Sequence, residues 1–342
     1  MKEQLVKVLR GGRLTEEEAG AAMATIMEGA ATPAQIGALL GALAVRGETE
    51  DEVVGFARTM RERAVPLRAA EAVDTCGTGG DGASTFNIST VASLVVAACG
   101  VRVAKHGNRS ASGSCGSADV LETLGVKIDA STESVQRCLD DTGWAFLFAP
   151  AFHASTRHAV GPRKELGVRT AFNLLGPLTN PARPVAQVVG VPRPELLGFM
   201  ARCLGRLGAR RALVVHGSGL DELTLAGETV VAEVADGTVR ERTIRAEDAG
   251  LASASLEDVR GGDSAENARL AREVLEGRGG ARRDVVLLNA AAALLVAGRA
   301  SDLRGIRTRG WGQPGRARRG PRRAPPRRAG RRAGPDNAPA AR

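Results

Sequence analysis

The sequence contains few aromatic residues: Phe, Trp and Tyr make up 3% of its 342 residues, and Tyr is absent. A surface on which successive nucleic-acid bases stack needs several aromatic rings, so a platform for single-stranded nucleic acid is not expected. The longest apolar runs, residues 91–99 and 290–297, are too short to span a bilayer. The first residues also lack the apolar core of a signal peptide.

Cysteines with the spacing of a zinc or redox site are missing as well. The five cysteines are odd in number, and no two are spaced as C-x-x-C. This pattern favours free thiols in a reducing compartment over disulfides or a zinc site. We therefore expect a cytoplasmic protein that does not enter the membrane.

Positive charge is abundant, but it is confined to one end of the chain. The net charge is +9, and residues 304–342 alone carry +12, which leaves −3 for the first 303 residues. Of the 38 residues from 305 onward, 32 are Ala, Gly, Pro or Arg. Such a segment cannot bury an apolar core, so we expect a disordered tail. A natural basic tail and the product of a reading-frame shift both remain open, and the abrupt change after Arg304 favours the shift.

Two domains are expected before the tail. Residues 1–65 carry the start signals of short amphipathic helices: Thr15–Glu18 and Thr49–Glu52 are capping boxes, and Pro33 follows Thr32 at a first helical position. From residue 70 to 303, strand-like runs alternate with helical ones, which predicts an α/β domain with a mostly parallel sheet flanked by helices. Helices from about 155–180 are expected to join the first domain. The predicted strands are 72–76, 101–104, 145–148, 185–191 and 212–215, with a hairpin over 229–244 around Asp236-Gly237.

The first chemical signal is the glycine-rich stretch from Cys76 to Thr90, between a predicted strand and a predicted helix. Glycines there let backbone N–H groups point at an anion, and the helix N-terminus adds unpaired N–H groups and a favourable dipole. The spacing matches neither standard nucleotide-binding loop. A plain strand–helix turn is the alternative, and Asn87, Ser89 and Thr90 are the candidate side-chain donors.

A second polar stretch, from Lys105 to Ser117, follows the next predicted strand and should lie beside the first. Lys105 offers a point charge for phosphate, Arg109 offers a planar fork, and serines 112, 114 and 117 offer hydroxyls. His106 is a candidate base, although a lone histidine is more often structural. Two anion-binding turns on neighbouring strands indicate a phosphorylated ligand much more strongly than one.

Two further stretches complete the pattern. Residues 158–181 mix basic and apolar residues, and we interpret Lys164 there as part of a solvated face. Asp221 and Glu222 follow a strand that ends at His216-Gly217. Adjacent carboxylates in such a loop can hold Mg²⁺ directly or through waters, although isolated Asp-Glu pairs are common on surfaces.

Together these motifs resemble the anthranilate phosphoribosyltransferase family over about residues 1–303. The matching segments are Gly77-Thr-Gly-Gly-Asp-Gly82, Asn87-Ile-Ser-Thr90, Lys105-His-Gly-Asn-Arg109, Gly116-Ser-Ala-Asp119, Arg163-Lys-Glu-Leu-Gly167 and Phe172-Asn-Leu-Leu-Gly-Pro-Leu178. The resemblance implies a small helical domain against an α/β domain, a homodimer through the helical part, and a role in tryptophan biosynthesis. It implies transfer of a phosphoribosyl group from phosphoribosyl pyrophosphate (PRPP) to anthranilate, with Mg²⁺.

Carried over by motif, the resemblance implies three groups of site residues. Those expected to bind PRPP are Gly77, Gly80, Asp81, Thr85, Asn87, Ile88, Ser89, Thr90, Lys105, His106, Gly107, Asn108, Arg109, Ser112, Gly113 and Ser117. Those expected to bind anthranilate are Gly77, Asn108 and Arg163. Those expected to serve Mg²⁺ are Ser89, Asp221 and Glu222. Two residues depart from the family pattern: Gly113 stands at a position that is usually serine, and Cys115 is an unusual neighbour.

The implied chemistry requires little acid–base catalysis. An aryl amine is largely neutral at pH 7, so we expect no essential general base, and Lys105 and Arg163 would act by electrostatics and positioning. A pyrimidine nucleoside phosphorylase of the same architecture is an alternative, but its Lys-His-Ser-Thr-Gly-Gly turn is missing. A non-catalytic nucleic-acid-binding relative is another, and the charge of −3 on the first 303 residues argues against it.

Overall fold

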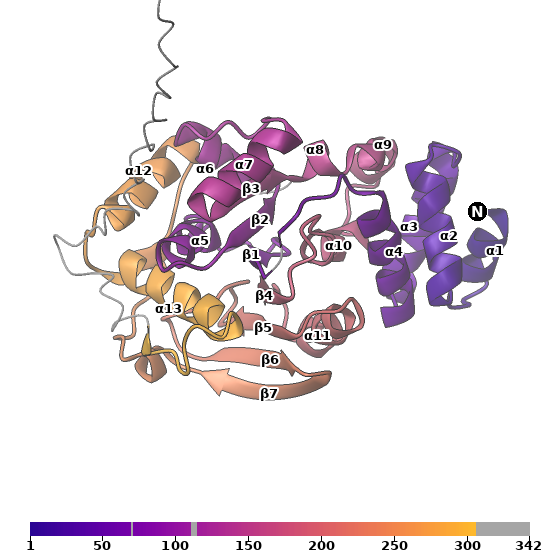
Figure 1. Ribbon diagram of the computed structural model, residues 1–342. Helices are drawn as coiled ribbons and strands as arrows, with labels where there is room; N and C mark the ends of the chain where they lie inside the picture. Colours follow the sequence, from indigo (N-terminus) through magenta and orange to yellow (C-terminus); the bar gives the residue numbers. More distant parts are fainter. Residues whose placement is uncertain (70, 111–114, 306–342) are drawn as a thin grey trace, which may run out of the picture.

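A computed structural model describes residues 1–69, 71–110 and 115–305 of the chain. In Figure 1 the four N-terminal helices stand together at one end of the molecule, and a central sheet with helices on both sides forms the rest. The predicted tail lies outside the described residues, apart from Arg304 and Gly305. No helix in the described ranges is long and apolar enough to cross a membrane.

The N-terminal helices begin where their capping residues stand. These helices are α1 (Lys2–Leu9), α2 (Glu16–Met27), α3 (Pro33–Arg46) and α4 (Glu50–Arg63). At the start of α2, the Thr15 hydroxyl accepts from the Glu18 N–H and the Glu18 carboxylate accepts from the Thr15 N–H. The same reciprocal box opens α3 and α4, so each helix start satisfies backbone donors that would otherwise be unpaired.

The helical bundle continues directly into one side of the sheet. Helices α9 (Arg157–Leu166), α10 (Phe172–Leu178) and α11 (Leu196–Arg206) pack against α3, α4 and α4 respectively. Leu39 and Phe56 from the bundle share one apolar cluster with Val189 and Val214 from the sheet. A single core therefore spans the bundle and this face of the sheet.

Arg61 is buried at this junction. Its Nε donates to the carbonyl of Leu178 at 2.6 Å, and its Nη1 donates to the carbonyl of Leu207 at 2.8 Å. These carbonyls lie at the C-terminal ends of α10 and α11, where the helix dipole favours a positive charge. Burial lowers the pKa of Arg61 to about 10, so it remains charged at neutral pH.

The sheet has seven strands in the order β3-β2-β1-β4-β5-β6-β7, of which the first five are parallel. The strands are β1 (Val73–Gly77), β2 (Val103–Gly107), β3 (Trp144–Phe148), β4 (Ala186–Gly190), β5 (Arg211–Gly217), β6 (Thr229–Ala235) and β7 (Thr238–Ile244). The last two form the antiparallel hairpin predicted around Asp236-Gly237. Chain order reverses at β1, because β2 lies on one side and β4 on the other, and such a point is where α/β sheets usually bind ligands.

Helices cover the second face of the sheet and its β3 edge. Helix α5 (Ile88–Ala98) packs against α13 (Ala281–Val296), and α6 (Ser117–Thr123) packs against α12 (Ser264–Leu275). Near β3 lie α7 (Thr132–Thr142) and α8 (Ala149–Phe152). The α/β fold class predicted from the sequence is confirmed by this arrangement.

Candidate functional site

The first glycine-rich turn connects β1 to α5 at the point where the strand order reverses. Gly79, Gly80 and Gly82 all have positive φ angles, of 69°, 81° and 73°. Side chains rarely adopt this conformation, so glycine is required for the turn to fold this way. The Gly79 N–H donates to Oδ2 of Asp221 at 2.8 Å, and the Gly79 carbonyl accepts from Arg169 at 3.1 Å.

Two acidic residues reach this turn from the loop after a strand that is not adjacent to β1. Asp221 and Glu222 follow β5, and β4 lies between β5 and β1. The loop after β5 can cross to the first turn because β4 and β1 both end in glycine, which has no side chain in its way. A Cβ on Gly190, the last residue of β4, would overlap the backbone of Asp221, and a Cβ on Gly77 would overlap the Asp221 carboxylate.

Glu222 closes the start of α5. Its Oε1 accepts from the N–H of Ser89 at 3.1 Å, which is one of the N–H groups that lack a partner within the helix. Asn87 occupies the usual capping position, but its side chain makes no capping hydrogen bond. The carboxylate from the β5 loop therefore does what an Asn side chain normally does at a helix start.

Three carboxylates crowd together at this edge of the sheet. Burial raises the pKa of Asp221, and the neighbouring Asp81 raises it further. Burial likewise raises the pKa of Glu222, and the charge of Asp221 raises it further. Both shifts disfavour the ionised forms, and a bound cation would favour them.

The donor set fits Mg²⁺ better than it fits a metal held by protein alone. Within the described ranges, no three His, Cys, Asp or Glu side chains are grouped so that they could hold a metal. Mg²⁺ is usually held by one or two carboxylates, with waters and substrate phosphates filling the other positions. Two adjacent carboxylates beside the glycine-rich turn match that arrangement.

Lys105 lies on β2 and not in the turn after it, because β2 runs on to Gly107 in register with β3. The strand end expected at Ala104 is therefore wrong. The Lys105 side chain is 2% exposed and points into the sheet edge, where Nζ donates to the carbonyl of Thr75 and to Oγ of Ser89 at 3.4 Å. A buried positive charge lies directly beneath the first turn.

His106 also lies on β2 and faces the other side. Its Nδ1 donates to the Gly176 carbonyl at 3.1 Å, and its ring centroid lies 5.4 Å from that of His153. Burial and, to a smaller extent, the nearby His153 lower the pKa of His106 to about 3. The ring is therefore neutral at physiological pH.

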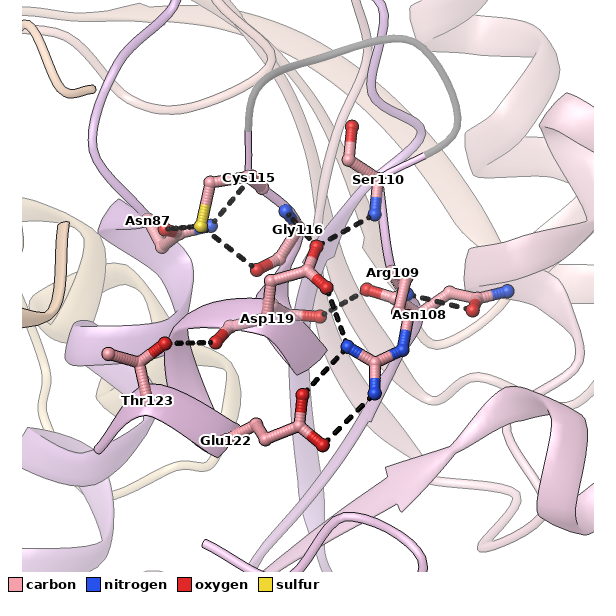
Figure 2. A network of polar contacts seen from close by, with 10 residues as sticks. Asn87, Asn108, Arg109, Ser110, Cys115, Gly116, Asp119, Glu122 and Thr123 are labelled. Atoms are coloured by element: carbon pink, nitrogen blue, oxygen red, sulfur yellow. Dashed lines mark hydrogen bonds and ion pairs between the residues drawn. The ribbon is translucent and has the colours of Figure 1, made fainter. Parts of the chain in front are cut away.

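The second turn is organised around Asp119 of α6, as Figure 2 shows. Asp119 Oδ2 accepts from the N–H of Gly116 at 2.8 Å and of Ser110 at 3.2 Å. Its Oδ1 accepts from Arg109, whose guanidinium also pairs with both oxygens of Glu122. Arg109 is thus held by two carboxylates, so a phosphate would have to compete for it.

Several residues of this turn that were expected to bind PRPP make hydrogen bonds or close contacts within the turn itself. Asn108 is exposed, and its Oδ1 accepts from the Arg109 N–H at 2.8 Å, while Ser117 donates to the Asn108 carbonyl at 3.3 Å. A Cβ on Gly107 would overlap Ser117, so glycine is needed at that strand end. Ser112 and Gly113 lie outside the described residues.

Of the remaining residues of the first turn that were expected to bind PRPP, two lie in the loop and two have their side chains in the core. Asp81 accepts from the Ala83 N–H at 3.2 Å, and Thr85 is half-buried, forming a β-bridge with Arg260. Ile88 and Thr90 are each 1% exposed, so their side chains are part of the core and only their backbones could meet a ligand.

Arg163 comes from a different part of the molecule. It lies on α9, at the side of the bundle, and its guanidinium stacks over the Phe172 ring with 4.8 Å between the guanidinium carbon and the ring centroid. Burial lowers its pKa, and among the described residues no carboxylate forms a salt bridge with it. A half-buried arginine without a carboxylate partner can bind a carboxylate ligand.

Sequence reasoning missed three residues that shape the site: Gly190, Arg169 and Asn267. Gly190 is the last residue of β4 and belongs to no sequence motif, yet its lack of a side chain leaves room for the acidic loop after β5. Arg169 lies within residues 158–181, a stretch noted for its basic residues. Its hydrogen bond to the first turn forms only in the folded chain, so the sequence did not indicate it. Asn267 donates to Oδ1 of Asn87 at 3.1 Å across 180 residues of sequence, a contact that no local pattern could signal.

Comparison with known proteins gives consistent matches over nearly the whole described chain. A family model for the glycosyl transferase family, a/b domain, matches residues 69–309, and one for the helical bundle domain of that family matches residues 2–64. The anthranilate phosphoribosyltransferase of Moorella thermoacetica is 57% identical over 306 residues, which covers 89% of this chain and 90% of the relative. That of Geobacter sulfurreducens is 53% identical over 319 residues, with 88% and 91% covered.

Two solved structures show the same architecture. The anthranilate phosphoribosyltransferase of Thermus thermophilus matches with a TM-score of 0.85 and 48% identity, covering 90% of this chain and 92% of that one. The Saccharomyces cerevisiae anthranilate phosphoribosyltransferase in complex with PRPP and Mg matches with a TM-score of 0.81 and 25% identity, with the same coverage.

Proposed function

The chain belongs to the anthranilate phosphoribosyltransferase family, and from this premise we propose that it transfers the phosphoribosyl group of PRPP to the amine of anthranilate, in tryptophan biosynthesis. The products are N-(5-phosphoribosyl)anthranilate and pyrophosphate. The observation that carries the proposal is the meeting of the glycine-rich turn with the acidic pair, through the Gly79–Asp221 and Ser89–Glu222 hydrogen bonds. It would supply both a cradle for phosphates and a place for a cation.

PRPP would lie at the C-terminal ends of β1 and β2. The backbone of Gly77 to Thr90 would face its diphosphate, Lys105 would neutralise charge from below, and Asn108 and Ser117 would approach from the second turn. Asp221 and Glu222 would hold Mg²⁺ with Ser89 beside them. When bound, Mg²⁺ would neutralise the charge that develops on the departing pyrophosphate.

The chain's own residues would then mainly hold and orient the two substrates. Lys105 keeps its ammonium group fixed between Thr75 and Ser89, so little reorganisation is needed as negative charge builds on the leaving group. Arg163 would bind the anthranilate carboxylate and Asn108 would contact the same substrate near Gly77, which aims the amine at the ribose carbon.

The amine should not need a strong base. An aryl amine is largely unprotonated at neutral pH, and its excess proton becomes acidic only after the new bond forms. His106 donates through Nδ1 to the Gly176 carbonyl, so it could accept a proton only at Nε2, which is buried. Burial also lowers the pKa of the ring to about 3, which makes it a weak base. We therefore assign it no essential catalytic role.

The helical part has features that support a homodimer. Val6 and Leu9 of α1 are 46% and 61% exposed, and Val45 of α3 is 92% exposed. Helix α1 packs against α3, and apolar side chains exposed on neighbouring helices can mark a contact between subunits. Sedimentation velocity should give a species of twice the chain mass, and a monomer at micromolar concentration would contradict this assignment.

The same proposal assigns the domains. Residues 1–65 would form the helical domain, joined by the helices of about 155–180, and residues 70–303 would form the α/β domain. The packing of α9 on α3 and of α10 on α4 supports this division. Residues 306–342 lie outside the described part of the chain.

The activity is tested by the loss of anthranilate fluorescence when PRPP and Mg²⁺ are added. Asp221→Asn should abolish most of the Mg²⁺-dependent rate, because one carboxylate charge is lost without a change in shape. Asp236→Asn is the matched control, since Asp236 lies in the turn between β6 and β7. Fluorescence that persists with the wild-type chain, while anthranilate and PRPP both bind, would refute the proposed reaction.

A further inference from the structure

A buried asparagine on α12 holds the side chain of Asn87 in place. Asn267 is 2% exposed, and its Nδ2 donates to Oδ1 of Asn87 at 3.1 Å. Its own Oδ1 accepts from the N–H of Gly262 at 2.8 Å. The contact joins the start of α5 to the start of α12, two elements on the same face of the sheet.

The hydrogen-bond directions in this chain of contacts are fixed by chemistry. A backbone N–H can only donate, so the oxygen of the Asn267 amide must face Gly262 and its nitrogen must face Asn87. The nitrogen can only donate, so the Asn87 amide must present its oxygen to Asn267. The orientation of one amide therefore sets the orientation of the other.

The contacts of the Asn87 amide with Cys115 require the same orientation of the amide. Its Nδ2 donates to the carbonyl of Cys115 at 3.3 Å, and the Cys115 thiol lies 3.6 Å from its Oδ1 (Figure 2). Asn87 thus ties the first turn to the second. An amide nitrogen carries two hydrogens, and among the described residues only the Cys115 carbonyl accepts from it.

Asn87 is available for this role because another residue caps the helix. Glu222 accepts from the Ser89 N–H, so the Asn87 side chain is not needed at the helix start. Within the described part of the chain no acceptor is recorded for its second N–H, so that hydrogen is available for a ligand.

We propose that Asn267 is a positioning residue for PRPP: through its hydrogen bond to Asn87, it keeps the Asn87 amide nitrogen turned toward the ligand and toward the second turn. The inference rests on the proposed function, in which Asn87 contacts PRPP. Asn267 itself touches neither substrate nor metal. Without its donor, the Asn87 amide can rotate by 180° and present its oxygen to the phosphates.

Two variants of Asn267 distinguish the effect of losing its hydrogen-bond donor from the effect of an added negative charge. Asn267→Asp keeps the acceptor for Gly262 but replaces the donor with an oxygen, which repels the Asn87 oxygen. Asn267→Leu removes the donor without adding charge. Val274→Ala is the control, since Val274 is buried on the same helix and its truncation lowers stability without touching Asn87.

The dissociation constant of PRPP, measured by calorimetry in the presence of Mg²⁺, is the main readout. Asn267→Asp should raise it about tenfold or more, because a hydrogen bond to a charged group is lost or reversed. Asn267→Leu should raise it less. The KM for anthranilate and the kcat at saturating PRPP should change by less than about threefold, and Val274→Ala should leave PRPP affinity unchanged.

The same variants made in an Asn87→Ala background decide whether the effect passes through Asn87. There Asn267→Asp should cause no further loss of PRPP affinity, and a loss that persists would show a direct charge effect and overturn the inference. PRPP affinity that falls with Asn87→Ala but not with either Asn267 variant would also overturn it, while leaving the proposed site intact. If Asn87→Ala alone has no effect, the assignment of Asn87 to PRPP fails as well.

Discussion

Replacing His106 should change how the stability of the protein depends on pH. The ring is 6% exposed, and burial with the nearby His153 lowers its pKa to about 3, from an ordinary value of 6.5. Below pH 6.5 the unfolded chain therefore binds a proton that the folded protein does not. The stability that His106 contributes is present above pH 6.5 and is lost as the pH falls toward 3.

The size of the loss follows from these two pKa values. Between pH 7.5 and pH 5.0, a group that titrates at 6.5 in the unfolded chain and at about 3 in the folded protein removes about 2 kcal/mol from the free energy of unfolding. The result hardly depends on the folded value, because any pKa below about 4 leaves the ring neutral at pH 5.0. His153 behaves similarly, but it is present in both proteins and cancels in the comparison.

The assay compares the wild-type protein with His106→Asn, whose amide nitrogen can replace Nδ1 as the donor to Gly176. Urea unfolding followed by circular dichroism at both pH values gives the free energies. The variant will be less stable at both, since it leaves a cavity, but the gap should shrink by about 2 kcal/mol at pH 5.0. A gap that does not change with pH, or an NMR signal of His106 that titrates near pH 6.5, would refute the reasoning.

Three other predictions concern the site. Arg163→Ala should raise the KM for anthranilate about tenfold or more with little change in PRPP affinity, and an unchanged KM in steady-state kinetics would exclude its role as carboxylate ligand. Gly190→Ala should weaken Mg²⁺ binding in calorimetry, because its Cβ would displace the backbone of Asp221, whereas Gly37→Ala, in open space on α3, should leave Mg²⁺ binding as it is. Lys105→Met should lower kcat about a hundredfold in the fluorescence assay, and a kcat within threefold of wild type would show that its charge is not used.

The parts of the fold that could be predicted from the sequence depend on local signals. The capping box at Thr15 acts between neighbouring residues, and so does the turn at Asp236-Gly237. The strand after Val101 was predicted to end too early, at Ala104. Lys105 and His106 look like turn residues, but pairing with β3 keeps them in the sheet and buries both. Tertiary pairing decided the strand end there, and no local propensity reports it.

The site was predictable where its residues are consecutive and was missed where they are brought together by folding. The glycine-rich turn and the Asp221-Glu222 pair each have a chemical pattern of their own. Gly190 and Asn267 have none, because the role of each depends on a neighbour that is distant in sequence. Arg109 illustrates the opposite case, since a residue suited to phosphate pairs with Asp119 and Glu122.

The buried contact of Arg61 makes the junction between bundle and sheet respond unevenly to ionic strength. At the edge of this junction, Arg206 pairs with Glu16 at 2.8 Å and with Asp51 at 2.7 Å, and these side chains are exposed enough for mobile ions to screen them. Arg61 is held by carbonyl dipoles inside the protein, where mobile ions do not reach. In concentrated electrolyte the outer pairs weaken while the Arg61 contact persists, so the two parts can loosen at the rim and stay joined at the centre.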